Sequence, residues 1–309
     1  MKVFTYIEID DDVLFLLLKD MTTRKNIIFA TSDYDELDKK INCETQISKK
    51  IISNYKDYII KPRVMRSIEV QSKRTKDKAE VFTPSWLCNQ MNNHLDDEWF
   101  GKKNVFNKAK NKTWITNDKK IKFSKDKTWQ DYIKSKRIEI TCGEAPYIVS
   151  RYDTTTGEYI EIKNRIGMLD RKLRVIKENA KSQSEWKKWV IEAYKSIYGY
   201  EFQGDSLLIA RINLYLTYEE YLYEAWNKKP SDEEVKEICN IINWNLWQMD
   251  GITCNIPLVK MKDDGQFTIF DYLNDSKKKK EQKTNAPVEC IIYDWDKNKK
   301  IKFKDIKRG

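Results

Sequence analysis

The sequence is poor in the residues that build zinc sites and histidine-based catalytic triads. Its 309 residues include one histidine, His94, and six cysteines, none of which forms a Cys-X-X-Cys pair. Both kinds of site therefore have little support, and we expect His94 to be structural and no metal to be bound. The cysteines are most simply explained as reduced, buried thiols of a cytoplasmic protein.

Long apolar segments are also missing. The best apolar run, residues 13–18, is strand length and falls far below the roughly 20 residues that span a bilayer. The N-terminus shows no basic stretch followed by an apolar one, which is the pattern of a secretory signal. Both absences predict a cytoplasmic protein without a membrane partner.

Positive charge and hydrophobic residues are both abundant. Lysine and arginine number 58 against 48 aspartate and glutamate, a formal net charge of +10, and hydrophobic residues make up 40% of the chain. The composition predicts a folded core and favours a polyanionic partner such as DNA. The basic stretches 73–78 and 165–174 are candidate phosphate contacts, although solvated charged segments explain them equally well.

The chain divides into three parts by pattern. Residues 1–78 predict a β-containing extension, with a hairpin of residues 13–18 and 26–30, followed by a polar, basic linker. Residues 79–275 predict the main domain. Residues 276–309 predict a mobile lysine-rich loop, then a C-terminal hairpin whose strands flank residues 296–299.

The main domain alternates strands and helices. Helices are expected over residues 86–94, 183–198 and 205–216 and after Ser231, which begins a capping box. Strands are expected at 137–141 and 197–201, and residues 101–127 are expected to form an irregular insertion. The fold class that this order indicates is α/β, a doubly wound sheet.

Four short segments of this domain suit the ligand site of an open α/β sheet, which lies at the carboxyl ends of the strands. Gly143 follows the first strand and allows backbone to approach a ligand. Glu201 ends the second strand, where a carboxylate accepts hydrogen bonds from ribose hydroxyls. Asp250 follows a third helix and strand and suits an adenine amino group. Residues 80–84 precede them all.

In this order the segments resemble the cofactor-binding half of N6-adenine DNA methyltransferases of the gamma arrangement, which include type I modification subunits. Residues 78–86, 139–153, 165–174 and 244–251 also resemble mobile-element proteins labelled "restriction endonuclease subunit M". The resemblance implies a methyltransferase-like fold, methyl transfer from S-adenosylmethionine to adenine in DNA, and a protein partner from a restriction-modification system. It assigns the cofactor to Phe82, Thr83, Pro84, Thr141, Cys142, Gly143, Glu201 and Asp250.

Two departures from that family concern the chemistry. Glu144 stands inside the glycine loop, where it is suited to face the cofactor's ammonium group. The six prolines never occur in pairs, so the Asp/Asn-Pro-Pro-aromatic tetrapeptide that holds the flipped base is missing. Two substitutes remain, Asn255 and the acceptor–aromatic pair of Asp294 and Trp295, and these three are the predicted catalytic residues.

Two other functions stay open. A catalytically silent protein of the same fold, binding DNA or a protein partner, agrees with the missing tetrapeptide. A metal-dependent nuclease would use Asp153, Glu161 and Lys163, although such a triplet arises often by chance in a chain rich in lysine and glutamate.

Overall fold

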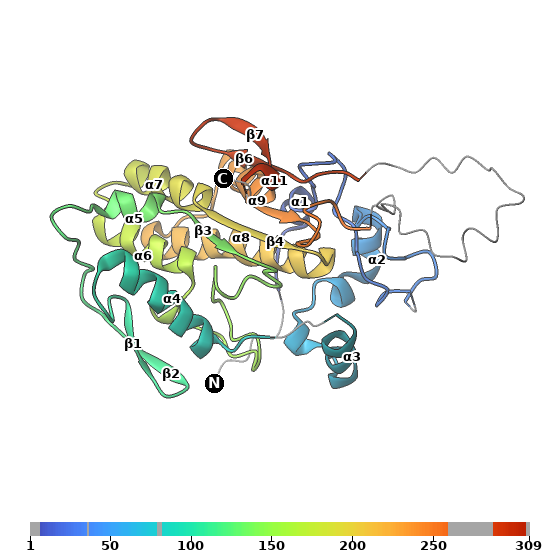
Figure 1. Cartoon of the computed structure of the whole chain (residues 1–309), viewed down its shortest axis with the longest axis horizontal. Coiled ribbons are helices and arrows are strands. Elements are labelled where there is room, and N and C mark those ends of the chain that lie inside the picture. The colour runs from blue at the N-terminus through green and yellow to red at the C-terminus, as the bar shows by residue number, and fades with distance from the viewer. Residues whose placement is uncertain (1–6, 36, 79–81, 259–286, 307–309) are drawn as a thin grey trace, which may run out of the picture.

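The computed structural model describes residues 7–35, 37–78, 82–258 and 287–306 of a mixed α/β protein (Figure 1). Its helices and 3-10 turns are α1 (Asp11–Leu16), α2 (Lys49–Ile59), η1 (Arg63–Met65), α3 (Ile68–Lys78), α4 (Ser85–Phe100), α5 (Trp129–Lys134), η2 (Ile162–Asn164), α6 (Met168–Asn179), α7 (Gln183–Lys195), α8 (Gly204–Trp226), α9 (Asp232–Asn245) and α11 (Phe303–Ile306). Its strands are β1 (Asn107–Lys110), β2 (Thr113–Thr116), β3 (Arg137–Glu139), β4 (Ile197–Glu201), β5 (Leu246–Gln248), β6 (Ile291–Asp294) and β7 (Lys299–Lys302).

The central sheet has three parallel strands in the order β3-β4-β5. Strands β4 and β5 are buried along their whole length, whereas β3 is an edge strand and only partly buried. Because parallel strands run in the same direction, all three end on one side of the sheet, which we call the carboxyl edge. The expected order of strand, helix, strand, helix, strand is confirmed.

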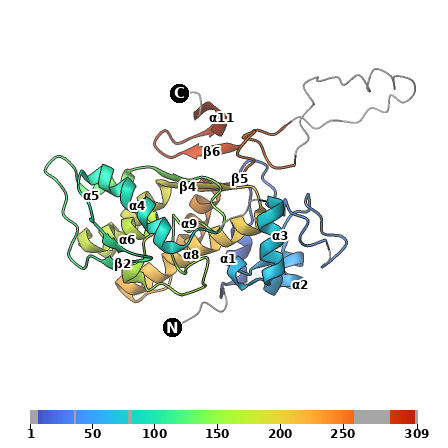
Figure 2. The same cartoon turned by 60° about the horizontal axis from the view of Figure 1, so that its bottom comes forward.

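Alternate residues of the central strands face different layers, as the period of a strand requires. Tyr200 and Trp247 pack with Phe303 against the C-terminal hairpin β6–β7, and the rings of Trp247 and Phe303 lie 5.2 Å apart. Ile197 and Leu246 join the larger core, on the side where α7, α8 and α9 contact β4. Figure 2 shows the hairpin and the helices on either side of β4 and β5.

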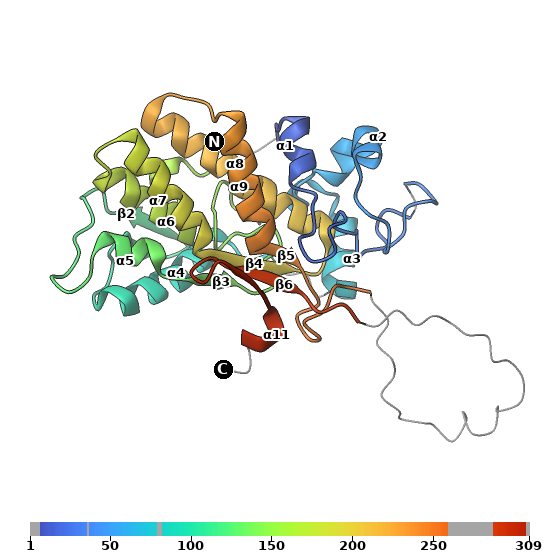
Figure 3. The same ribbon diagram turned by 90° about the horizontal axis from the view of Figure 1, so that it is seen from above.

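Helix α8 is the most deeply buried element, and every residue from 204 to 218 is buried. A helix that is buried on all sides belongs to the centre of a core. Its charged residue Asp205 accepts a 2.7 Å hydrogen bond from the Tyr34 hydroxyl and pairs with Arg66 and Arg74. Figure 3 shows α1, α2 and α3 gathered beside the same end of α8.

The N-terminal region is not the expected hairpin. Residues 13–16 lie in α1, whose N-cap Asp10 accepts a 2.8 Å hydrogen bond from the Asp12 amide. Among the described residues before α2, strand pairing is limited to isolated bridges, such as Lys19 with Asn26. The apolar run 13–18 fits a helix as well as a strand, and packing of α1 on α9 decides the outcome. Residues 2–6 of the expected first strand lie outside the described residues.

Four cations of the two basic stretches are not available for the predicted phosphate contacts. Arg74, Arg165, Arg171 and Lys172 are all at least 93% buried, whereas Lys73 and Lys76 of the first stretch are exposed. Arg171 binds Asp96 of α4 at 2.6 Å, and Lys172 donates to the carbonyl of Ile133 at 2.8 Å. Buried cations need internal partners, so these side chains join helices to one another and do not face DNA.

Several other expectations are confirmed. The Ser231 capping box begins α9, α4 begins at Ser85, and β6 and β7 form the C-terminal hairpin. The insertion 101–127 is less irregular than expected, because β1 and β2 form a hairpin within it. The lysine-rich stretch 276–284 lies outside the described residues. Within the described parts, the longest apolar helices are too short or too polar to cross a membrane.

Asp205→Asn tests the ion cluster that joins the N-terminal region to α8. The substitution leaves Arg66 and Arg74 buried beside a neutral group, so we expect the free energy of unfolding to fall by about 3 kcal/mol. Urea denaturation at neutral pH measures this. The control is Asp11→Asn, which removes an exposed ion pair with Lys56 and should change stability by less than about 1 kcal/mol.

The same cluster should lose its contribution in acid. Burial alone would raise the pKa of Asp205, but the charges of Arg74 and Arg66 outweigh it and hold that pKa below its ordinary value. The stabilisation is therefore complete above the unfolded-state pKa of about 3.9 and is lost as pH falls toward the folded-state value. We expect the difference between wild type and Asp205→Asn to shrink below about pH 4. A constant difference across this range would contradict the assignment.

Candidate functional site

The carboxyl edge brings two of the predicted cofactor segments into direct contact. The amide of Gly143, in the loop after β3, donates a 2.8 Å hydrogen bond to the carboxylate of Glu201 at the end of β4. The other Glu201 oxygen accepts from the amides of Phe202 and Gln203 at 2.9 and 3.1 Å. The carboxylate is thus aligned by backbone donors from two neighbouring strand ends.

The loop after β3 has an unusual backbone. Thr141, Gly143 and Ala145 all have positive φ, at 47°, 53° and 64°. This conformation is open to glycine, but for a β-branched residue such as Thr141 it is a genuine outlier. Strained backbone of this kind is concentrated at ligand sites. Between these residues, Cys142 is buried, and its burial raises the pKa of its thiol well above the ordinary value.

Asp250 lies one strand further along the carboxyl edge. The amide of Met249, just after β5, donates to the Glu201 carbonyl at 3.0 Å, so Asp250 follows directly beside the end of β4. Its carboxylate accepts from the amide of Ile252 at 2.8 Å and so holds its own turn. The Asp250 amide donates to the carbonyl of Asn255 at 2.9 Å, which places this predicted catalytic residue at the same edge.

The segment of Phe82, Thr83 and Pro84 reaches the loop through Arg63. The Arg63 guanidinium lies 4.2 Å from the centre of the Phe82 ring, and the Arg63 amide donates to Glu144 at 2.7 Å. Pro84 is the N-cap of α4. Glu144 is buried and also accepts from the Tyr152 hydroxyl at 2.6 Å. The expectation that Glu144 faces a cofactor ammonium group is therefore wrong, because its carboxylate is turned into the core.

Asp294 and Trp295 lie at the opposite edge of the sheet. The indole N–H of Trp295 donates at 2.7 Å to Asn245, the residue that precedes β5. The Asn245 amide donates in turn to the carbonyl of Ile197, where β4 begins. Asp294 accepts from the amide of Asp296 at 3.1 Å and shapes the hairpin turn. The structure thus separates this predicted catalytic pair from Gly143 and Glu201 by the length of the strands.

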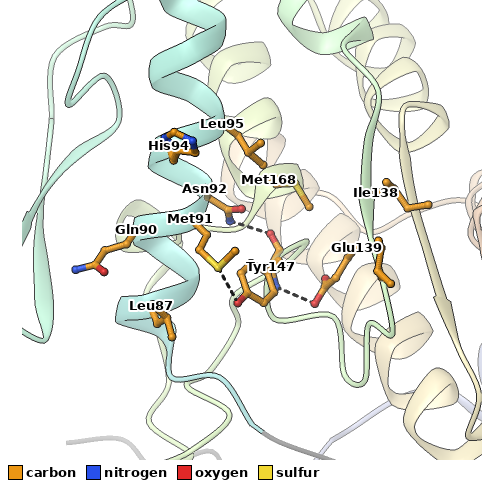
Figure 4. A pocket seen from close by; sticks show the side chains of 11 residues that line it. Leu87, Gln90, Met91, Asn92, His94, Leu95, Ile138, Glu139, Tyr147 and Met168 are labelled. Atoms are coloured by element: carbon orange, nitrogen blue, oxygen red, sulfur yellow. Dashed lines mark hydrogen bonds between the residues drawn. The ribbon is translucent and has the colours of Figure 1, made fainter. Parts of the chain in front are cut away.

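A cavity of about 540 Å³ lies between α4 and the outer edge of β3, and we call it the α4–β3 cavity (Figure 4). It is lined by apolar side chains and a few polar ones, namely Leu87, Gln90, Met91, Asn92, His94, Leu95, Ile138, Glu139, Ile140, Tyr147 and Met168. The predicted cofactor and catalytic residues lie outside this lining. A concave, mostly apolar space with a few polar groups is the usual form of a ligand pocket.

Glu139 is the residue of this cavity that sequence reasoning missed. It ends β3, and its carboxylate accepts from the amides of Tyr147 and Ile148 at 3.4 and 3.1 Å. Burial raises the pKa of Glu139 well above its ordinary value, although those two amides act in the other direction. The signal that could have found it is an acid in a strand directly before a glycine loop. His94 is exposed on the rim, 3.5 Å from Glu98.

The nuclease triplet does not assemble. Asp153 accepts from the amide of Ser85 at 2.7 Å, while Lys163 pairs with Glu161 on the surface at 3.2 Å. Across the described residues, no group of three or more His, Cys, Asp or Glu side chains is placed to hold a metal ion.

The chain has no match among known proteins in three comparisons: no family model, no curated protein and no solved structure matches it.

Thr141→Gly tests whether the loop after β3 is strained. A left-handed conformation costs a non-glycine residue about 1–2 kcal/mol, and the extra backbone entropy of glycine offsets about 0.5–1 kcal/mol of the gain. We expect a net stabilisation of about 0.5–1 kcal/mol by urea denaturation. Asn111→Gly in the β1–β2 turn, where φ is 51°, is the control. Asparagine tolerates this conformation, so the control should gain less. A decrease in stability of Thr141→Gly would contradict the strain.

Proposed function

We propose that this protein binds S-adenosylmethionine at the carboxyl edge and is an N6-adenine DNA methyltransferase or a close relative. The observation that carries the proposal is the contact between Gly143 and Glu201. It joins a glycine loop with left-handed backbone to a carboxylate at the end of the neighbouring parallel strand. Open α/β sheets bind nucleotide-like ligands at such strand ends, with the carboxylate on the ribose.

The residues at this edge fit such a cofactor. A Cβ placed on Gly143 would meet no atom within 4 Å, so there is open space above the loop. The side-chain oxygen of Gln203, two residues after Glu201, is buried and has no hydrogen-bond partner among the described residues. A buried acceptor of this kind needs a donor, such as a ribose hydroxyl.

When bound, the cofactor supplies an activated methyl group, and no metal or covalent enzyme intermediate is needed. The residues of the carboxyl edge would position the cofactor. Glu201 would accept hydrogen bonds from the sugar, Asp250 would accept from the adenine amine, and the Phe82–Arg63 pair borders the loop. The methyl acceptor must then enter from the side of the sheet where the loop is exposed, since Cys142 beneath it is buried.

A basic surface suits the DNA partner. A second cavity of about 860 Å³ lies between the face of the sheet and the β6–β7 hairpin, and we call it the hairpin cavity. Five exposed lysines surround it, namely Lys136, Lys297, Lys299, Lys300 and Lys302. Three of them pair with acids, Lys136 with Asp296, Lys297 with Asp294 and Lys302 with Glu289, so Lys299 and Lys300 are the best placed to meet phosphates. Lysine clusters of this kind bind phosphates through charge and carry no sequence information. This surface replaces the cations of residues 165–172 that the fold buries, while Lys73 and Lys76 of the first basic stretch are exposed and remain part of the proposal.

One observation favours a second candidate, a catalytically silent relative that binds cofactor or DNA. Asp294 and Trp295, the predicted acceptor–aromatic pair, lie at the wrong edge of the sheet for methyl transfer. A methylation assay with labelled S-adenosylmethionine and DNA of mixed sequence separates the two candidates. Label in adenine supports the methyltransferase, whereas cofactor and DNA binding without transfer supports the silent relative.

Glu201→Ala tests the cofactor site. Removing hydrogen bonds to a charged acceptor should weaken S-adenosylmethionine binding by about 1.5–3 kcal/mol, measured by calorimetry. The carboxylate also binds its own backbone, so thermal unfolding must show that the variant remains folded at the assay temperature. Glu69→Ala, at an exposed position of α3, is the control and should bind as wild type. No binding by wild type at millimolar cofactor would sink the proposal.

Reversing two charges on β7 tests the DNA surface. The double variant Lys299→Glu/Lys300→Glu should bind duplex DNA more weakly. Its log–log dependence on salt should be less steep by about 0.9 for each DNA phosphate that is no longer neutralised. The matched control is Lys110→Glu/Lys112→Glu, two exposed lysines at the turn of the β1–β2 hairpin. An equal weakening in the two variants would mean that only net charge matters.

A further inference from the structure

We propose that the α4–β3 cavity is a pocket for an amine-bearing nucleobase, with Asn92 and Glu139 as hydrogen-bond acceptors and Tyr147 as its aromatic wall. The inference deepens the proposed function and rests on it, because it identifies where the target base of a methyltransferase of this kind would lie. It assigns the acceptor and aromatic roles to residues other than Asn255, Asp294 and Trp295.

One residue of the cavity lining, Asn92, has a hydrogen-bond acceptor without a partner among the described residues. Asn92 is 1% exposed, and its amide nitrogen donates to the carbonyls of Tyr147 and Ile166 at 2.9 and 3.0 Å. Its side-chain oxygen has no hydrogen-bond partner among the described residues. A buried amide oxygen without a donor costs free energy, so a ligand that brings an N–H group to it is favoured.

The outer edge of β3 adds backbone groups. The Arg137 amide donates to the Ser196 carbonyl at 2.9 Å, so the backbone N–H and C=O groups of Arg137 and Glu139 face β4. Ile138 alternates with them, so its backbone N–H and C=O groups face away from β4. A backbone donor and acceptor at this edge match the edge of a heteroaromatic base.

The walls suit a flat ring. Met91, Ile138 and Ile140 line the cavity and are 53%, 45% and 63% exposed, far above what is usual for apolar side chains that pack internally. The Tyr147 hydroxyl donates to the sulfur of Met91 at 3.2 Å, which fixes the aromatic ring against α4 (Figure 4). Stacking on aromatic and apolar side chains is how proteins hold an unstacked base.

The position of the cavity relative to the carboxyl edge also fits. On the side of β3, the lining of the cavity ends at Ile140, one residue before the left-handed loop of Thr141 and Gly143. Glu139 pairs in register with Gly199 of β4, two residues before Glu201. A base in the cavity and a cofactor at Glu201 would therefore be neighbours across the same loop. Asn255, beside Asp250, is two strands away.

The test measures binding of free deoxyadenosine to the full chain by saturation-transfer NMR. S-adenosylhomocysteine is present in excess, so that the cofactor site is filled. The 2′-deoxyribonucleoside of unsubstituted purine, which lacks the exocyclic amine and has no ring N–H, is the matched ligand. We expect deoxyadenosine to bind about tenfold more tightly, since the acceptors stay unpaired with the unsubstituted purine. Met91→Trp, at an exposed position that fills the cavity, and Tyr147→Ala should each weaken deoxyadenosine binding by about tenfold.

The controls keep the result interpretable. Tyr147→Phe retains the ring and should restore binding, and Tyr58→Ala, at a 63% exposed tyrosine of α2, should bind as wild type. Binding of labelled S-adenosylmethionine should be unchanged in Met91→Trp. Equal affinity for the two nucleosides, or full affinity in both cavity variants, would overturn the pocket while leaving the cofactor site intact. Absence of cofactor binding in the wild type would instead overturn the proposed function alone.

Discussion

The structure depends on helix α8 and on the partners of its buried polar side chains. Asp205 binds the N-terminal region through Tyr34, Arg66 and Arg74. Arg211, further along the same helix, donates to the carbonyls of Leu17 and Leu246. A buried charge is tolerated only with such partners. Segments that are distant in sequence are therefore fixed around one helix, and the carboxyl edge is held against its first turn.

The carboxyl edge combines a strained loop with an aligned carboxylate. Gly143 and Glu201 are fixed by a hydrogen bond between neighbouring strands, so neither group needs to reorganise much to meet a ligand. The closely packed start of α8 supports them from below. A Cβ on Gly204 would lie 1.9 Å from the Ile28 carbonyl oxygen, so only glycine fits there. Rigid backbone around the loop is the physical basis for regarding this edge as a site.

One face of the central sheet is covered, whereas the outer edge of β3 is not. The β6–β7 hairpin and α11 cover one face with Ile292 and Phe303, and the outer edge of β3 remains accessible beside α4. An accessible strand edge with exposed isoleucines is a liability unless something uses it. Asn92, whose side-chain oxygen has no hydrogen-bond partner among the described residues, lines the same cavity. The α4–β3 cavity therefore combines an accessible strand edge, an apolar wall and a hydrogen-bond acceptor that has no partner among the described residues.

The sequence by itself determined the local elements that depend on short-range signals. Capping at Ser231, the strand pattern ending at Glu201 and the polar segment 296–299 predicted α9, β4 and the C-terminal hairpin, because each signal lies within a few residues of the element it controls. Order along the chain also placed Gly143, Glu201 and Asp250 at strand ends.

Only the tertiary structure decided which charges are buried and which strand edge stays accessible. Residues 13–16 became a helix through packing on α9, and Arg171 and Lys172 were turned inward by partners more than 35 residues away. The cavity residues Asn92 and Glu139 come from segments 47 positions apart, and no local pattern can report that they meet.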